Sequence, residues 1–232
     1  MAPADGVPNL GELAMSQVLR RSPEVGTART GLVLAGVGGV MAAFFYVATV
    51  VLGGAIVPGY SHLRHSVSEL TSPGAHYRAL LALGFLLYNI AVAILGIGLL
   101  RSSAPSRWSR IAAVLLLVCA AAGILQIEPF PQDPMGSPIT AAGGVHIALA
   151  GLSAISLVVS LLMFARAWRQ DATWMPLCRF SVIAAIAILV TGGIGAALVT
   201  SPVFGLLERL TQLSFLSWFA GVGVLGLRRA KR

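Results

Sequence analysis

Charged side chains are scarce in this sequence. Asp, Glu, Lys and Arg together make up 10% of its 232 residues, whereas hydrophobic residues make up 57%. A soluble globular domain carries about 25% charged residues. A chain with so few charges cannot cover a water-facing surface. The composition therefore excludes an ordinary soluble domain and indicates an integral membrane protein.

Cysteines are few, and specific catalytic motifs are missing. The sequence has 2 cysteines, Cys119 and Cys178, which fall within an apolar run or at the inner end of one. A disulfide framework is therefore not expected. The sequence has no H-E-x-x-H zinc motif, no G-x-S-x-G nucleophile motif and no glycine-rich phosphate loop. No cofactor is predicted on this basis, and no enzyme class follows from a motif.

Long apolar runs, by contrast, are abundant. A helix that spans a membrane needs roughly 20 predominantly apolar residues. Six uncharged runs reach or approach this length: residues 31–57, 79–100, 111–127, 139–165, 180–200 and 210–227. They predict an all-α integral membrane protein with six transmembrane helices in one bundle. The predicted divisions are a tail at 1–30, the membrane domain at 31–228 and a basic tail at 229–232.

The positive charges favour one side of this arrangement. The chain has 16 Lys and Arg against 8 Asp and Glu, which gives a net charge of +8. With the N-terminus placed inside, only Arg64, Arg78 and Arg209 fall on the outer side. Positive residues concentrate on the cytoplasmic side of membrane proteins. We therefore expect a multi-pass protein of the cell membrane with both termini in the cytoplasm. The net charge requires no nucleic-acid partner.

Polar chemistry is concentrated in residues 58–78, between the first two apolar runs. This stretch, which we call loop one, holds three of the 4 histidines. An apolar set and a polar set of its residues each recur at helical spacing, namely Leu63, Val67 and Leu70, and His62, His65, Ser66 and Glu69. The pattern predicts a short amphipathic helix, capped by Ser61, that lies in the membrane interface.

Residues 128–138, which we call loop three, hold a second polar group. Four prolines within these eleven residues restrict the backbone and hold Asp133 in place. His146 follows about two turns into the next apolar run, where a polar side chain needs a partner. Because loops one and three leave the predicted bundle on the same side, we expect them to meet, with Ser66 near Gln132.

The candidate site residues come from these two loops and from the start of the fourth apolar run. Imidazole and carboxylate groups can serve as acid, base or zinc ligand, and arginine can pair with phosphate. The catalytic candidates are His146, Asp133, His65 and Glu69; the ligand-binding candidates are His62, Arg64, His65, Ser68, Glu69, His76, Arg78, Asp133 and His146; the metal candidates are His62, His65 and His146. No spacing among them is specific for a metal, so zinc is only an alternative. A structural role is the competing interpretation for each residue, since Pro-x-Asp-Pro, for example, is ordinary turn chemistry.

Several short motifs resemble those of a known family. They are Pro-Gly-Tyr-Ser at 58–61, Val-Ser-Glu-Leu at 67–70, Pro-Gly at 73–74, Phe-Pro-x-Asp-Pro-x-Gly at 130–136, and His146. In a six-helix frame they resemble the prokaryotic membrane family known as domain of unknown function 998, over roughly residues 31–228. The resemblance implies the fold and no activity. A looser similarity, in residue types alone, is to the membrane hydrolases that include alkaline ceramidases, whose paired histidines in one helix this chain lacks.

Three functional classes remain open from the sequence. The leading prediction is a non-catalytic membrane protein whose outer polar site binds a lipid headgroup or a partner protein. The second is a membrane-embedded lipid hydrolase, with zinc as an option. The third is a small-molecule transporter in which Asn89, Ser153, Ser156 and Ser160 line a path. The spanning runs carry no acid or arginine away from their ends, which disfavours an ion-coupled pump.

Overall fold

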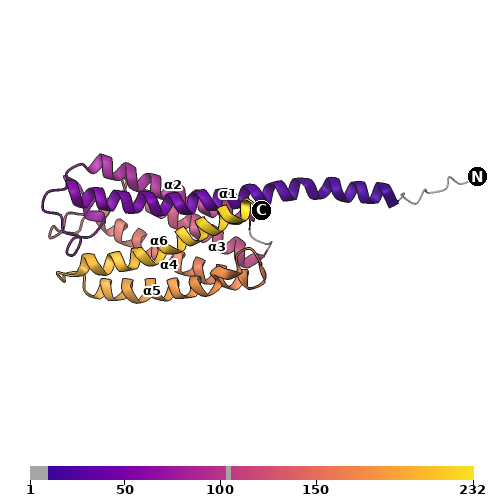
Figure 1. The fold of residues 1–232 in the computed structure, drawn as a ribbon. Coiled ribbons are helices and arrows are strands. Elements are labelled where there is room, and N and C mark those ends of the chain that lie inside the picture. The colour runs from indigo at the N-terminus through magenta and orange to yellow at the C-terminus, as the bar shows by residue number, and fades with distance from the viewer. Residues whose placement is uncertain (1–9, 103–105) are drawn as a thin grey trace, which may run out of the picture.

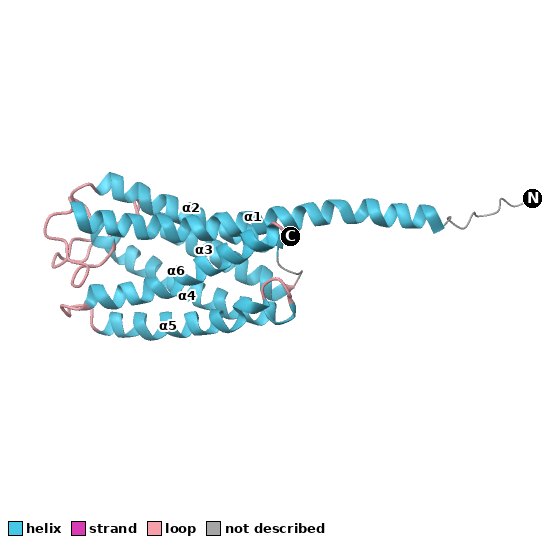
Figure 2. Ribbon diagram, viewed as in Figure 1, coloured by secondary structure: helices cyan, strands magenta, loops and turns pink. Residues whose placement is uncertain are grey.

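A computed structural model describes residues 10–102 and 106–232 of the chain, with side chains from residue 26 onward. The described residues form helices and loops and no strand (Figure 1, Figure 2). The α-helices are α1 (Leu10–Ile56), α2 (Arg78–Ser102), α3 (Arg107–Leu125), α4 (Ala141–Ala167), α5 (Cys178–Ala197) and α6 (Phe204–Ala230). Three short 3-10 helices are η1 (Ser68–Thr71), η2 (Trp168–Gln170) and η3 (Met175–Leu177). Residues 1–9 of the predicted tail and 103–105 of a predicted inner turn lie outside the described residues.

Six helical segments in the described part of the chain are long and apolar enough to cross a membrane. They are Gly26–Ile56, Arg78–Ser102, Arg107–Leu125, Ala141–Gln170, Met175–Ala197 and Phe204–Ala230. The predicted all-α architecture with six spanning helices is confirmed. The first helix differs from its predicted start at residue 31, because α1 already begins at Leu10. A search for uncharged runs detects only the apolar part of a helix and misses a charged extension.

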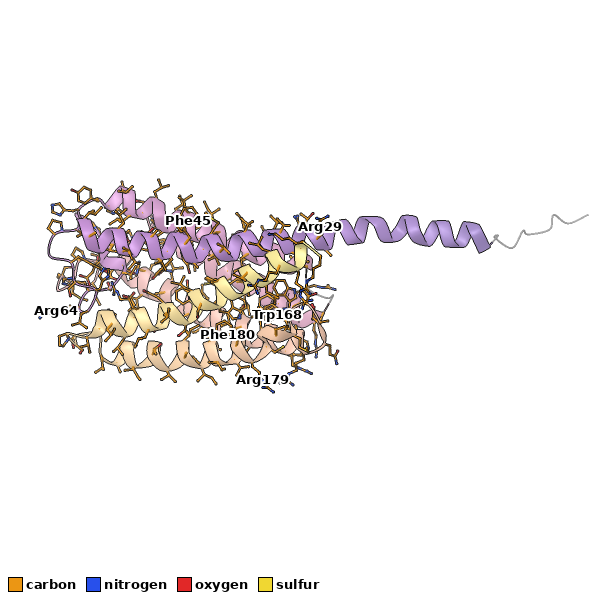
Figure 3. The ribbon with its side chains drawn as sticks, in the orientation of Figure 1. Arg29, Phe45, Arg64, Trp168, Arg179 and Phe180 are labelled. Carbon is orange, nitrogen blue, oxygen red and sulfur yellow. The ribbon has the colours of Figure 1, made fainter. Side chains whose placement is uncertain are left out.

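The two ends of the bundle differ in character (Figure 1). The C-terminus and the point where α1 leaves the bundle lie at one end, which we call the terminal end. Loop one, loop three and the turn between α5 and α6 lie at the other, which we call the loop-one end. Arg29, Trp168 and Arg179 lie toward the terminal end, whereas Arg64 lies at the loop-one end (Figure 3). An even number of spanning helices places both ends of the helical domain on the same side.

Helix α1 packs closely between α2 and α6 because it carries glycines on both faces. A Cβ on Gly38 would overlap the backbone of Leu95 in α2. A Cβ on the neighbouring Gly39 would overlap the carbonyl oxygen of Phe219 in α6. Lipid tails give no hydrophobic drive for helix association, so membrane helices associate through such close van der Waals contact. The small residues of α1 therefore fix the position of α6 and, with it, the polar residues at the start of α6.

Aromatic side chains fill the bundle at its terminal end. Trp168, Trp174, Trp218 and Phe164 are all 0% exposed. The ring centroids of Trp168 lie 5.4 Å from Trp174 and 5.9 Å from Trp218, in stacked geometry. The indole nitrogen of Trp218 donates to the Ser181 hydroxyl at 2.8 Å. These contacts join α4, α5 and α6 at the terminal end of the bundle.

Loop one does not form the predicted amphipathic helix. It consists of turns, with only Ser68–Thr71 in a 3-10 helix. The backbone N–H of Ser66 donates to the Glu69 carboxylate at 2.7 Å, and that of Val67 donates to the Glu208 carboxylate at 2.7 Å. These two donors are thus unavailable for helical bonds to the preceding turn. Periodicity could not reveal this, because Glu208 comes from a distant helix.

Candidate functional site

His146 joins loop one to loop three from the second turn of α4. Its ring is 5% exposed. Nδ1 lies 2.9 Å from the carbonyl oxygen of Phe130, and Nε2 lies 3.3 Å from the hydroxyl of Ser68. Thr140 caps the N-terminus of α4, because its side chain accepts a hydrogen bond from the Gly143 N–H. The imidazole therefore has a partner on each side, one from each loop.

Direct side-chain contact also joins the two loops. The amide nitrogen of Gln132 donates to the hydroxyl of Ser66 at 3.2 Å. The same hydroxyl accepts the backbone N–H of Glu69 at 3.2 Å, while the Glu69 carboxylate accepts the N–H of Ser66. This reciprocal pair is a capping box, and it starts η1 where Ser61 was predicted to cap a longer helix. The predicted meeting of loops one and three is confirmed.

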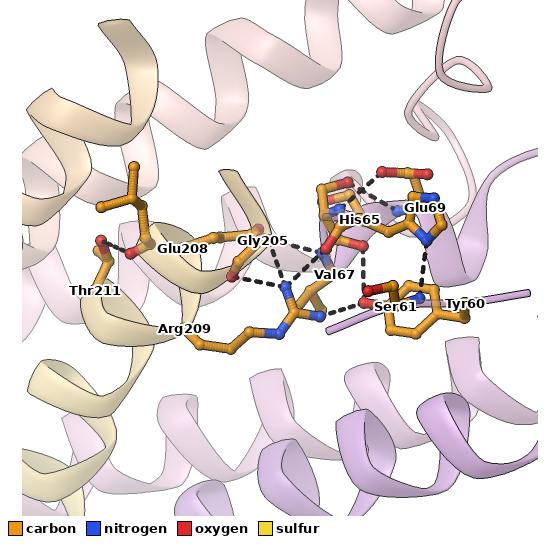
Figure 4. Close-up of polar contacts among 12 residues, drawn as sticks. Tyr60, Ser61, His65, Val67, Glu69, Gly205, Glu208, Arg209 and Thr211 are labelled. Carbon is orange, nitrogen blue, oxygen red and sulfur yellow. Dashed lines mark hydrogen bonds and ion pairs between the residues drawn. The ribbon is translucent and has the colours of Figure 1, made fainter. Parts of the chain in front are cut away.

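The start of α6 holds loop one in place from the other side (Figure 4). The Glu208 carboxylate accepts the Val67 N–H, and its Oε2 lies 3.5 Å from the Arg209 guanidinium. Arg209 donates to the carbonyl oxygens of His65 at 2.7 Å and Gly205 at 2.9 Å, and to the Tyr60 hydroxyl. Sequence reasoning assigned neither Glu208 nor Arg209 to the site. The sequence feature that could have identified them is an acidic residue next to a basic residue between the last two apolar runs.

Desolvation and the charge of Arg209 affect the ionisation of Tyr60 and of the more exposed His62. Desolvation raises the pKa of Tyr60 to about 12, although the adjacent Arg209 guanidinium acts to lower it. Desolvation also lowers the pKa of His62 from its ordinary value, and the positive charge of Arg209 acts in the same direction. Both side chains therefore favour their neutral forms at physiological pH.

A cavity of about 160 Å³, lined by both polar and apolar side chains, lies under loop one, between the helices. Five α-helices, η1 and adjoining loop residues contribute to its wall: Tyr46, Val67, Ser68, Thr71, Phe85, Tyr88, Asn89, Cys119, Gly123, Gln126, Ile127, His146, Ser153 and Glu208. Gln126 donates to the Ser153 hydroxyl at 3.3 Å across the wall. Neither Tyr46 nor Tyr88 has a hydrogen-bond partner for its hydroxyl within the described residues. Buried hydroxyls of this kind pair with water or with a ligand.

A second depression of about 300 Å³ lies on the surface of loop one. Three of the predicted site residues, His65, Glu69 and His76, line it together with Pro134 and Met135 of loop three. Ser68 and His146 line the inner cavity instead. The structure thus divides the predicted shared site into an outer depression and an inner cavity.

The remaining candidates lie in neither space. Asp133 accepts the N–H of Thr140 at 2.8 Å and its hydroxyl at 2.9 Å, so it supports the cap of α4. Arg78 donates to the Thr71 carbonyl at 2.9 Å and pairs with Glu128 at 3.0 Å, which ties loop one to the start of loop three. His62 is exposed and packs over Gly54 of α1, and Arg64 is exposed.

The described residues contain no group of three or more His, Cys, Asp or Glu side chains that could hold a metal ion. His146 is in contact with Ser68 and Phe130, whereas the His65 Nδ1 accepts the N–H of Ser61 at 2.9 Å. The metal candidates His62, His65 and His146 do not form such a group. Zinc stays an untested alternative.

Of the four residues proposed for a transport path, two line the cavity, whereas Ser156 and Ser160 do not. Asn89 and Ser153 contribute to its wall. The Asn89 amide donates to the Phe85 carbonyl of its own helix at 2.9 Å. Ser160 is 0% exposed and donates to the Ala112 carbonyl at 2.8 Å, which gives it a packing role between α3 and α4. The serines of α4 therefore do not form one continuous polar lining.

Comparison with known proteins gives one family. Residues 40–225 match the family described as "Protein of unknown function (DUF998)". The chain belongs to the DUF998 family. This match confirms the resemblance carried by the short motifs, and the six apolar helices agree with a multi-pass membrane protein of that family. No curated protein and no solved structure matches the chain. The DUF998 description carries no activity, so a function has to come from the site.

Proposed function

We propose that this DUF998 protein binds an ammonium-bearing lipid headgroup in the cavity under loop one. The proposal places loop one on the outer side of the cell membrane and both termini in the cytoplasm, as the arginine distribution favours. The observation that carries it is the cavity of about 160 Å³ with the Glu208 carboxylate and other polar side chains in its wall. A polar cavity open to ligand is costly next to lipid unless its groups find partners.

The charge of the wall selects the kind of headgroup. Among the described residues, Glu208 is the only carboxylate that lines the cavity, and no Lys or Arg lines it. The contacts of Glu208 with Val67 and Arg209 use Oε2, which leaves Oε1 for a ligand. The aromatic rings of Tyr46, Phe85 and Tyr88 stand in the same wall, and such rings attract cations. A carboxylate among aromatic rings suits an ammonium group better than a phosphate.

The packing of the terminal end favours binding over transport. A transporter needs a path from the cavity to the other side of the bundle. The stacked rings of Trp168, Trp174 and Trp218 fill that region and are 0% exposed. The cavity is therefore better explained as a binding site at the loop-one end than as part of a path through the bundle. A partner protein at loop one and a zinc hydrolase are the alternatives, and metal analysis distinguishes the hydrolase from headgroup binding.

Native mass spectrometry of the purified full-length protein tests the proposal. The protein is reconstituted from vesicles with equal amounts of phosphatidylethanolamine, which carries an ammonium, and phosphatidylglycerol, which does not. We expect the wild type to retain phosphatidylethanolamine preferentially. Glu208→Gln keeps the side-chain shape and should reduce this preference about tenfold, since a charge-assisted hydrogen bond contributes about 1.5–3 kcal/mol.

Glu128→Gln is the matched control. Glu128 lies in loop three, outside the cavity, so the same loss of charge should leave lipid preference unchanged. Equal retention of the two lipids by the wild type would contradict the proposal. Metal analysis of the same sample provides the second arm, since stoichiometric zinc that disappears in His146→Ala would support the hydrolase instead.

A further inference from the structure

A hydroxyl and an imidazole meet on the cavity wall. The Ser68 Oγ lies 3.3 Å from the His146 Nε2, and both residues line the cavity. A serine becomes a nucleophile when an adjacent base accepts its proton and a third group orients that base. The pair is separated by 78 residues in the chain, so its formation depends on the fold.

The tautomer of His146 follows from its other partner. Nδ1 lies 2.9 Å from the Phe130 carbonyl oxygen, which can only accept a hydrogen bond. In the neutral ring Nδ1 therefore carries the hydrogen, and Nε2 presents its lone pair to the Ser68 hydroxyl. The Phe130 carbonyl thus takes the role of the third group, because it fixes the orientation of the His146 imidazole.

Loop one holds Ser68 in position by bonds that leave its hydroxyl with no partner other than His146 among the described residues. The preceding Val67 N–H is taken by Glu208, and the Ser66–Glu69 capping box fixes the start of η1. Ser68 is half-buried and its neighbour His146 is 5% exposed. The hydroxyl consequently faces a sheltered space that can hold a reacting group.

We infer that Ser68 is the nucleophile, and His146 the general base, of an ester-cleaving site in this cavity. Oγ attacks the acyl carbon of a carboxylic ester while its proton passes to Nε2 of His146. The C–O bond to the alcohol then breaks, and the alcohol leaves with that proton. Water next attacks the acyl-serine, gives its proton to Nε2 and releases the carboxylic acid, and the proton returns to Oγ.

The wall and size of the cavity define the substrate class. A volume of about 160 Å³ corresponds to roughly five water molecules at ~30 Å³ each, which suits an acyl group of a few carbons. The hydroxyls of Tyr46 and Tyr88 lie in the same wall, and hydroxyl groups can donate to a developing oxyanion. The distance of 3.3 Å is longer than an ideal hydrogen bond, as is common before substrate binds.

Labelling with a fluorophosphonate probe tests the nucleophile. The full-length protein in mild detergent is treated with the probe, digested, and the modified residue identified by mass spectrometry. We expect modification of Ser68, together with hydrolysis of p-nitrophenyl acetate. Ser68→Ala should abolish both. His146→Gln should reduce both at least a hundredfold, because a general base contributes about 10²–10⁴-fold.

Ser72→Ala is the matched control. Ser72 is also in loop one, is 4% exposed, and its hydroxyl has no hydrogen-bond partner within the described residues. It should label and hydrolyse like the wild type. Absence of Ser68 modification in the folded wild type, or unchanged hydrolysis by Ser68→Ala, would overturn the inference and leave the pair a structural hydrogen bond. The soluble ester makes this outcome independent of lipid-headgroup binding.

Discussion

At the scale of single residues, several polar side chains at the loop-one end form hydrogen bonds with backbone N–H and carbonyl groups. Glu69 and Glu208 accept N–H groups of Ser66 and Val67, and Arg209 donates to the His65 carbonyl. Buried backbone groups without partners are costly, so irregular loops at a membrane boundary need such side chains. The Arg209 guanidinium of α6 is consequently held against loop one, where it donates to the Tyr60 hydroxyl.

Tyr60 should make stability fall at alkaline pH. Its pKa is raised by burial to about 12 in the folded protein, whereas tyrosine in an unfolded chain ionises near pH 10. Between these values the unfolded state loses a proton that the folded state keeps. The free energy of unfolding therefore decreases as pH rises from 10 to 12. Thermal unfolding of the wild type across this range should show the decline.

Tyr60→Phe removes the titrating group. This variant is expected to be less stable at neutral pH, because it loses the contacts with Arg209 and the Ser66 carbonyl, yet its stability should vary less between pH 10 and 12. Tyr77→Phe is the control, since Tyr77 is 56% exposed in the same loop. An alkaline slope in Tyr60→Phe as steep as in the wild type would rule out this origin.

At the scale of elements, the position of α6 depends on the glycines of α1. Gly39 faces Phe219 and Gly223 of α6, and Gly205 at the start of α6 faces the backbone of loop one. The Leu206 N–H donates to the Leu63 carbonyl at 3.1 Å, which joins α6 to loop one directly. The packing of α1 against α6 therefore also determines where Glu208 lies in the cavity wall.

Gly39→Ala should separate α1 from α6. The added Cβ would overlap the Phe219 carbonyl oxygen, a backbone atom that cannot move alone. Overpacking of this kind costs about 1–3 kcal/mol of unfolding free energy. Gly151→Ala in α4 is the control, because no heavy atom lies within 4 Å of its added Cβ, and alanine favours a helix by about 0.5–1 kcal/mol. Unfolding in mixed micelles measures both, and similar stabilities of the two variants would contradict the packing argument.

At the scale of the whole molecule, the bundle has a polar end and a sealed aromatic end. The cavity and the outer depression lie at the loop-one end, and the stacked tryptophans lie at the terminal end. The arginines follow the same polarity, with Arg29 and Arg179 near the terminal end and Arg64 at the other (Figure 3). The proposed orientation therefore exposes the polar cavity to the outer leaflet.

Cysteine labelling tests this orientation. In a background with Cys119 and Cys178 replaced by Ala, single cysteines at the exposed positions Arg64, Ser137 and Gln170 are treated with an impermeant thiol reagent in intact cells. We expect labelling at positions 64 and 137 and none at 170 until the cells are opened. Labelling of intact cells at position 170 alone would reverse the orientation.

The six spanning helices and the uneven distribution of the arginines were predictable from the sequence, as were loop one, loop three and His146 as the polar regions. Apolar length and charge are local properties, so a single chain displays them directly. The stiffness and position of the loops also sufficed to predict the contact between Ser66 and Gln132. Neither required knowledge of helix packing.

Which polar groups share a site depends on how the helices and loops pack against one another. Glu208 reaches Val67 across 141 residues, takes its N–H, and so prevents the helix that the periodicity of loop one predicted. Packing also placed Ser68 beside His146 and left Asp133 at the cap of α4. Such partners come from separate helices whose order around the bundle is set by close glycine contacts. Linear spacing carries no record of that order, and this is why the cavity became visible only in the folded chain.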